Sequence, residues 1–243
     1  MRDIDNLFNG MNQNDAHNTA QESLKTLFTT LTANQQPIRI IVGARETTQS
    51  GWVATDIDSL SLLEPQDWER YFAPATITAI MAEHVWEHLT PEQGIKAAQL
   101  CHKYLQEGGY LRLAVPDGFH PRQDYLDWVR PQGRGPDADD HKLLYKYLLL
   151  EEVLTAAGFK VELLEYFDET GKFHYQEWDP NQGLIKRSQR FDPRNDPSFD
   201  HDFDHQVPAT FAQEYSVQRL AECCQNPRNT YYTSIVVDAW KLS

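Results

Sequence analysis

Short apolar runs alternate along this chain with segments of helical character, and this alternation constrains the fold more than any other feature. The apolar runs are rich in β-branched residues, as buried strands are, and they lie at 37–44, 51–58, 75–82, 110–116, 159–167 and 231–240. Helix-like segments precede the first run or lie between later runs, at 18–34, 65–72, 91–109, 123–129 and 141–158. Strands that alternate with helices are typical of a mostly parallel sheet with both faces covered. We therefore predict an α/β fold.

Ligands on such sheets bind beyond the carboxyl ends of the strands. In this chain those ends fall at Gly43, Asp56, 82–84 and 116–118. A glycine at the first end lets the backbone approach a ligand closely. A carboxylate at the second end can accept hydrogen bonds from two ribose hydroxyls, as in dinucleotide-binding proteins. Each residue also has a simpler interpretation. Gly43 could belong to an ordinary tight turn, and the carboxylate of Asp56 could cap the turn that follows its strand.

The stretch EHVWEHLTPEQ, residues 83–93, contains the H-x-x-E-H spacing of a class of zinc peptidases. Such a site needs His84 and His88 one turn apart on a long helix, together with a third ligand. Here the motif follows a strand directly, and Thr90 and Pro91 interrupt any helix. We therefore expect no bound metal and keep a zinc metallopeptidase only as a remote alternative. The stretch can instead form a packed turn or the floor of a ligand cleft.

The order strand, EHVWEHL, helix and LQEGGYLRLAVPD resembles the second half of class I S-adenosylmethionine-dependent methyltransferases. The likeness is to the small bacterial predicted methyltransferases of the type 11 kind with a reduced glycine motif. It covers roughly residues 37–165, and YYTSIVVDAW at 231–240 is similar to the last strand of that subgroup. The resemblance implies a Rossmann-like methyltransferase fold, a mostly parallel sheet and an antiparallel last strand.

The same resemblance implies that the chain binds S-adenosylmethionine at the first, second and fourth strand ends, through Gly43, Ala44, Asp56, Ile57, Glu83 and His84. Two departures weaken this expectation. The family's G-x-G-x-G loop is reduced to VGARET, and only residues 45–51 link the first two strands, whereas a parallel crossover normally takes a dozen or more residues. The stretch 59–75 is also too short for a helix and the usual third strand. The alternative is a non-catalytic methyltransferase-like domain that serves as a binding or scaffold module.

Three residues in or near the loop that follows 110–116 are candidates for acid–base catalysis: Asp117, His120 and His141. Histidine titrates near neutral pH, so either imidazole could take a proton from an acceptor hydroxyl. Solvent-exposed polar loop residues are the simpler alternative. Aromatic residues in the predicted overhanging segments, such as Tyr125 and Trp178, favour a small-molecule or saccharide acceptor because aromatic faces stack on sugar rings.

The net charge and the cysteine content limit the kinds of partner and the cellular compartment that we expect for this protein. The formal net charge is −14, from 22 basic and 36 acidic side chains, which disfavours nucleic acid and anionic membranes. Three cysteines, one adjacent pair among them, form no disulfide framework. No apolar run resembles a signal peptide or approaches the length of a membrane span. We expect a cytoplasmic enzyme of unknown oligomeric state.

The expected organisation is an N-terminal polar segment and helix over 1–36 and a methyltransferase-like domain over 37–243. That domain carries a polar insertion at about 168–230, in which 173–178 and 183–191 are candidates for a hairpin. The acidic tract 192–205 includes His201 and His205 and could hold a divalent cation. A solvated acidic loop is the better interpretation.

Overall fold

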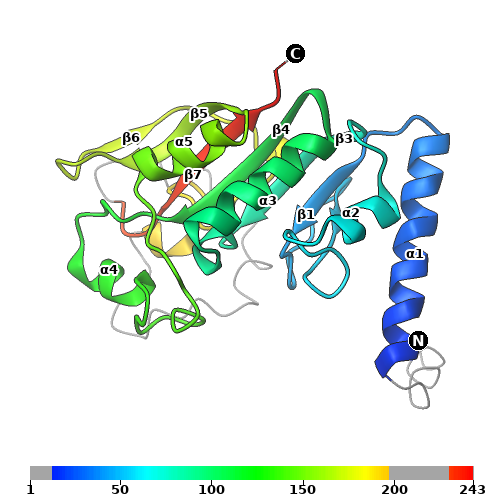
Figure 1. The fold of residues 1–243 in the computed structure, drawn as a ribbon. Helices are drawn as coiled ribbons and strands as arrows, with labels where there is room; N and C mark the ends of the chain where they lie inside the picture. Colours follow the sequence, from blue (N-terminus) through cyan, green and yellow to red (C-terminus); the bar gives the residue numbers. More distant parts are fainter. Residues whose placement is uncertain (1–12, 197–229, 243) are drawn as a thin grey trace.

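The structure of the protein is a computed structural model that describes residues 13–196 and 230–242. Its central sheet has the strand order β2-β1-β3-β4-β7-β5-β6 (Figure 1). Strands β2, β1, β3 and β4 are parallel neighbours, whereas β7 runs antiparallel to both β4 and β5. The strands are β1 (Arg39–Val42), β2 (Val53–Ala54), β3 (Ile77–Glu83), β4 (Leu105–Pro116), β5 (Lys160–Phe167), β6 (Phe173–Tyr175) and β7 (Ser234–Trp240).

This topology confirms the predicted Rossmann-like methyltransferase fold with an antiparallel last strand. It also confirms the shortening near the N-terminal edge. The link between β1 and β2 contains turns and no helix, and within the described residues β2 forms that edge of the sheet without a further strand beyond it.

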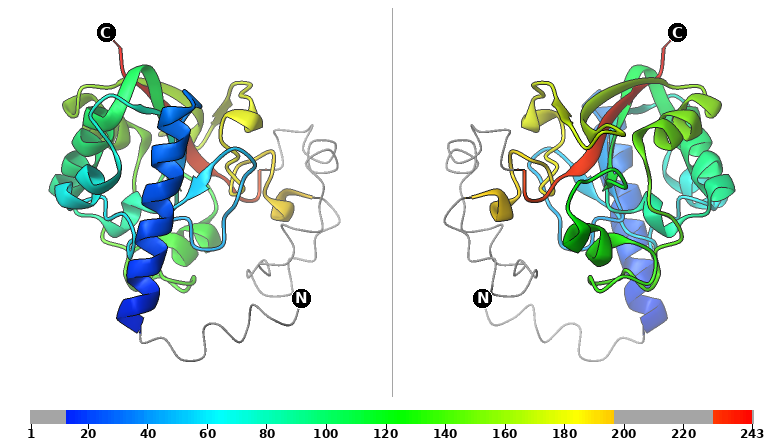
Figure 2. Two further views of the ribbon diagram at one scale, coloured as in Figure 1. Left: turned by 90° about the vertical axis from the view of Figure 1, so that its right-hand side faces the viewer. Right: turned by 90° about the vertical axis from the view of Figure 1, so that its left-hand side faces the viewer.

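Helices cover one face of the sheet (Figures 1 and 2), whereas the short helix over 123–129 packs in a separate cluster with Tyr232. Alternate strand residues, such as Ile40, Ile80 and Leu111, point into the larger apolar core on this side. The helices are α1 (Gln13–Ala33), α2 (Pro65–Tyr71), α3 (Pro91–Tyr104), α4 (Gln123–Val129) and α5 (Tyr147–Ala156). Helix α1 packs on α2 through Phe28, whose ring centroid lies 4.6 Å from that of Phe72. No helix among the described residues is long and apolar enough to cross a membrane.

The opposite face is covered by an irregular segment over 178–191 instead of a helix. Trp178, Ile185 and Phe191 of this segment are buried against the strands. The side chain of Arg112, in the middle of β4, donates to both carboxylate oxygens of Asp238 on β7 at 2.7 Å. Its remaining terminal nitrogen donates to two backbone carbonyls of the segment. The side chain of Arg112, itself held by the ion pair with Asp238, therefore joins this segment to the sheet through two hydrogen bonds.

The boundaries of two helices differ from those predicted. The helix expected over 91–109 ends at Tyr104, because the backbone then turns into β4, where Leu105 pairs with Ile77. Gly108, with φ +72°, therefore turns the chain within β4 and does not end a helix. The helix expected over 141–158 starts only at Tyr147.

The predicted hairpin between 173–178 and 183–191 is wrong, because β6 pairs with β5. The segment 183–191 forms no strand. It contacts the face of the sheet instead, as described above.

The two short 3-10 turns of the segment that follows β6 are η2 (Pro180–Gln182) and η3 (Pro193–Asn195). A third, η1 (Trp86–His88), follows β3 directly. The H-x-x-E-H residues are therefore not on a long helix. His84 has a left-handed backbone, with φ +55°, which separates β3 from the turn.

Candidate functional site at the carboxyl ends of β1, β2 and β3

The chain changes direction across the sheet next to β1. From β1 it continues to β2 on one side, and from there it reaches β3 on the other side of β1. Ligands of open α/β sheets bind at such a switch point, beyond the carboxyl ends of the strands. Gly43 ends β1 here with φ +60°, and a Cβ atom at this position would lie 2.6 Å from Cγ2 of Val85. The glycine thus lets the turns after β1 and β3 meet, and Ala44 beside it is buried in the smaller core.

The carboxylate of Asp56 holds the turn that follows β2. Its Oδ2 accepts a hydrogen bond from the backbone N–H of Arg45 at 2.8 Å, and its Oδ1 accepts from the backbone N–H of Ile57 at 2.8 Å. An ionised carboxylate offers about four acceptor positions, so two remain for a ligand. The side chain of Ile57 is 74% exposed. An acceptor of hydroxyl hydrogen bonds and an uncovered apolar surface therefore lie side by side.

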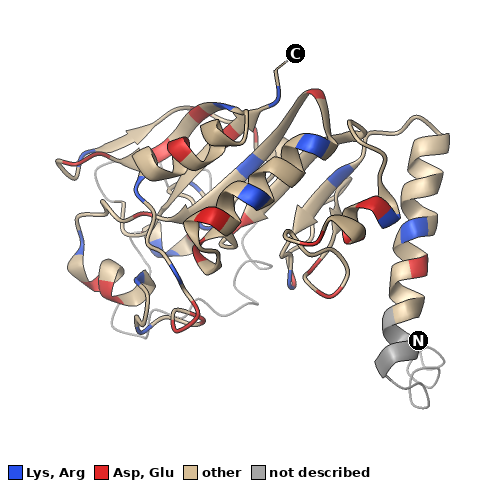
Figure 3. Cartoon of the chain, in the orientation of Figure 1, with Lys and Arg blue, Asp and Glu red and all other residues tan. Residues whose placement is uncertain are grey.

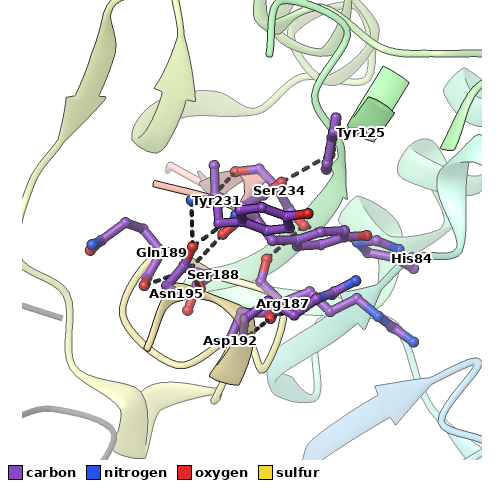
Figure 4. Close-up of polar contacts among 12 residues, drawn as sticks. His84, Tyr125, Arg187, Ser188, Gln189, Asp192, Asn195, Tyr231 and Ser234 are labelled. Carbon is purple, nitrogen blue, oxygen red and sulfur yellow. Dashed lines mark hydrogen bonds and ion pairs between the residues drawn. The ribbon is translucent and has the colours of Figure 1, made fainter. Parts of the chain in front are cut away.

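The end of β3 is held by protein contacts. Oε1 of Glu83 accepts from the backbone N–H of Arg187 at 2.6 Å. Nε2 of His84 lies 2.9 Å from the hydroxyl of Ser234, which donates to the carbonyl of Arg187 (Figure 4). Burial, with a contribution from the nearby positive charge of Arg187, holds the pKa of His84 well below its usual value. The imidazole of His84 is thus neutral and fixed in place.

The loop 187–195 carries buried polar groups that the sequence pattern does not predict. The side-chain amide of Asn195 donates to the carbonyl of Tyr232 and accepts from the N–H groups of Tyr231 and Tyr232 (Figure 4). The buried carboxylate of Glu165 accepts from the backbone N–H of Gln189 at 2.7 Å. These contacts place the loop against the start of β7. A polar, turn-rich stretch carries no signal for such burial.

Asp117 and His120, two of the predicted catalytic residues, lie together with Tyr125. The carboxylate of Asp117 accepts from the backbone N–H groups of Phe119 and Phe167, at 2.8 and 2.7 Å. Burial raises its pKa to about 7. The ring of His120 stacks on that of Tyr125, with 4.0 Å between centroids, and burial lowers its pKa to about 3. Both side chains are closed off from solvent.

His141, the third predicted catalytic residue, lies apart from these two and beside the turn η1. Its ring is 4.8 Å from that of His88 in an edge-to-face arrangement. One carboxylate oxygen of Glu87 and one ring nitrogen of each histidine lie within 4.8 Å of one another. Neither oxygen of Glu87 has a hydrogen-bond partner among the described residues, and Nδ1 of His84 lies 3.4 Å from Oε1. Burial raises the pKa of Glu87 to about 8.

In the sequence, Glu87 stands out only as part of the H-x-x-E-H motif. Its burial and its proximity to His141 depend on the path of the loop 130–146, which the local pattern does not reveal. An exposed ion pair between Arg45 and Asp137, at 2.5 Å, joins that loop to the turn after β1. The three strand ends and the Glu87 cluster therefore lie on connected loops.

Two hollows lined by described residues lie elsewhere. One is a small cavity between Tyr125, Arg194 and Tyr232, and the other is a shallow depression over α5. Neither includes Gly43, Asp56 or Glu83. The acidic tract 192–205 and the pair Cys223 and Cys224 lie wholly or mostly outside the described residues.

No protein family model and no curated protein matches the chain. Among solved structures, the chain is similar to an S-adenosylmethionine-dependent methyltransferase from Archaeoglobus fulgidus, with 11% identity, 89% of this chain and 92% of that chain covered, and a TM-score of 0.40. It is also similar to phosphoethanolamine N-methyltransferase 2 of Haemonchus contortus in complex with S-adenosylmethionine. For that pair the identity is 14%, the coverage 85% of this chain and 49% of the other, and the TM-score 0.39.

A third similar structure is a possible histamine N-methyltransferase from Thermotoga maritima, with 13% identity, 66% of this chain and 86% of that chain covered, and a TM-score of 0.38. The assignment of the fold rests on the strand order of this chain.

Proposed function

We propose that the protein is an S-adenosylmethionine-dependent methyltransferase that binds its cofactor beyond the ends of β1, β2 and β3. The observation that supports this most is the position of Gly43, Asp56 and Glu83 at the carboxyl ends of three neighbouring strands around the switch point. Solved structures with a similar fold are described as S-adenosylmethionine-dependent methyltransferases.

In this proposal Asp56 holds the ribose. Its two free acceptor positions receive the ribose hydroxyls, while its bonds to the backbone of Arg45 and Ile57 keep the carboxylate in place. The exposed side chain of Ile57 packs on the adenine, because apolar area removed from water stabilises the complex. The turn at Gly43 and Ala44 lies against the methionine part, and Glu83 and His84 form the floor. S-adenosylmethionine supplies an electrophilic methyl group when bound.

The acceptor that we propose is a small molecule or a saccharide with a free hydroxyl. The acidic net charge supports this, and Figure 3 shows Lys and Arg scattered among Asp and Glu over the described elements, without a basic stripe for a phosphate backbone. We do not propose nucleic acid or membrane partners. The roles of Asp117, His120 and His141 in removing the proton from the acceptor stay a prediction. Of the three, only His141 lies near the turn after β3.

A second candidate is a non-catalytic methyltransferase-like domain that binds a partner or serves as a scaffold. The helix-free link 45–51 favours it, since no helix N-terminus faces the cofactor site there. The contacts of Glu83 and His84 with the loop 187–195 favour it further, because these side chains are engaged by the protein itself.

Calorimetry with S-adenosylmethionine and its demethylated product distinguishes the two candidates. We expect binding by the wild-type chain and, for Asp56→Ala, a loss of about 1–3 kcal/mol, which is roughly a five- to 150-fold weaker Kd. Asp58→Ala is the matched control, since it removes a nearby exposed carboxylate and should leave binding unchanged. If a folded sample gave no binding heat up to millimolar cofactor, the methyltransferase would be excluded and the non-catalytic scaffold domain would remain.

The acceptor class is tested by transfer of a labelled methyl group to pooled sugars, small metabolites, nucleotides, RNA and DNA. Transfer to a sugar or a small metabolite is the expected result. Transfer to RNA or DNA alone would refute the proposed acceptor class, although the protein would still be a methyltransferase. If His120→Ala and His141→Ala both kept full activity, neither histidine would be the base that takes the proton from the acceptor.

A further inference from the structure

Glu87, His88 and His141 bring one carboxylate and two imidazoles together beside the turn η1. Their candidate ligand atoms lie within 4.8 Å of one another. The centre of a triangle with sides of this length is about 2.8 Å from each corner, whereas metal–nitrogen and metal–oxygen bonds are about 2.0–2.2 Å. Side-chain shifts of well under 1 Å would therefore complete three bonds to one ion.

Each of the two histidine rings has an oxygen acceptor beside its Nδ1. Nδ1 of His141 lies 2.7 Å from the carbonyl oxygen of Val129, and Nδ1 of His88 lies 3.2 Å from Oδ2 of Asp140. An acceptor at this distance keeps the proton on Nδ1 and leaves the lone pair on Nε2. Metal-binding histidines almost always donate their other N–H to a carbonyl or a carboxylate in this way.

Glu87 supplies an independent observation. Its side chain is fully buried, and neither carboxylate oxygen has a hydrogen-bond partner among the described residues. A buried carboxylate without partners is costly, and buried charges are generally paired or coordinate metals. The backbone carbonyl of Glu87 accepts from the N–H of Lys142, which fixes the turn against the loop that carries His141.

We propose that Glu87, His88 and His141 bind a divalent first-row transition-metal ion. Two imidazoles and one carboxylate are the ligand set of open zinc sites and of non-haem iron sites, whereas Mg²⁺ and Ca²⁺ prefer oxygen ligands throughout. Three protein ligands leave at least one position for water or for an oxygen atom of a small molecule. The sequence led us to expect no metal, and the set differs from that of the H-x-x-E-H motif, in which His84 and His88 would be ligands together with a third residue.

His84 is excluded as a ligand of the H-x-x-E-H type by its own contacts. Its Nε2 is engaged with the hydroxyl of Ser234, and its left-handed backbone takes it out of the helical register that such a site needs. Its Nδ1 lies 3.4 Å from Oε1 of Glu87. The proposal is independent of cofactor binding.

The test is zinc binding by the full chain after treatment with a chelator, measured by calorimetry without any cofactor, together with the visible spectrum of the Co²⁺ form. We expect one ion per chain. Glu87→Gln and His88→Gln should each weaken binding by at least about 100-fold, since loss of a ligand should cost no less than loss of a supporting contact. Glu87→Gln keeps the shape of the side chain and places no charge at this buried position, so it should fold at least as well, as its melting curve can show.

Two control variants keep the result specific. His174→Gln removes an imidazole that contacts the carboxylate of Asp168 elsewhere, and it should leave zinc binding unchanged. The double variant His201→Asn, His205→Asn removes the imidazoles of the acidic tract and should also bind one ion. The proposal is overturned if the wild-type chain binds no zinc, if Glu87→Gln and His88→Gln bind it normally, or if only the double variant loses it.

Discussion

Gly43→Ala tests the meeting of the turns after β1 and β3. The added Cβ atom would lie 2.6 Å from Cγ2 of Val85, in a backbone conformation with φ +60°. The left-handed conformation costs alanine about 1 kcal/mol. Overpacking adds about 1–3 kcal/mol, because a β-branched side chain cannot swing aside freely. We expect the variant to lose about 2–4 kcal/mol of its free energy of unfolding.

Val85→Ala removes the clash but leaves the backbone strain. In that background Gly43→Ala should cost only about 1 kcal/mol, so a double-mutant cycle should give a coupling free energy of about 1–3 kcal/mol. Urea unfolding of the four proteins measures it. Additivity within about 0.5 kcal/mol would refute the close packing of Gly43 on Val85.

Two further predictions concern buried charged and titratable groups. Asp238→Asn leaves the charge of Arg112 buried without its partner and should cost about 3–5 kcal/mol of unfolding free energy, whereas Asp127→Asn, in a surface ion pair, should cost less than about 1 kcal/mol. Burial lowers the pKa of His120 to about 3, so the unfolded chain binds a proton that the folded chain does not, and stability is lost as the pH falls from about 6.5 to 3. The raised pKa of Asp117 acts in the opposite sense between about pH 4 and 7. The difference between wild type and His120→Asn therefore isolates the histidine. That difference should reach roughly 3–5 kcal/mol, and an unchanged pH profile in urea titrations would contradict it.

Much of the fold follows from local pattern. The pattern at 123–129 predicts a short helix, which is α4 with the same bounds, and the β-branched runs form β1, β3, β5 and β7. Boundaries that depend on distant partners cannot be derived in this way. The residues from Leu105 onward join β4 because Ile77 pairs with Leu105, which the helical pattern of α3 does not reveal.

The candidate site likewise has a part that the sequence predicts and a part that it does not. Gly43 and Asp56 can be found because strand ends are visible in the sequence, and their position at one edge follows from a parallel sheet. The burial of Glu87, the approach of His141 and the loop 187–195 arise from tertiary contacts between segments far apart in the chain. No periodicity or composition signal reports such contacts, so these features come only from the structure.

The cofactor site is tested most directly by a crystal structure of the protein grown with the demethylated cofactor, S-adenosylhomocysteine. We expect its ribose within hydrogen-bond distance of the carboxylate of Asp56, its adenine on the side chain of Ile57 and its amino-acid part beside Gly43. Electron density for the ligand at another place, or none at a saturating concentration with this edge of the sheet accessible in the crystal, would contradict the proposed site.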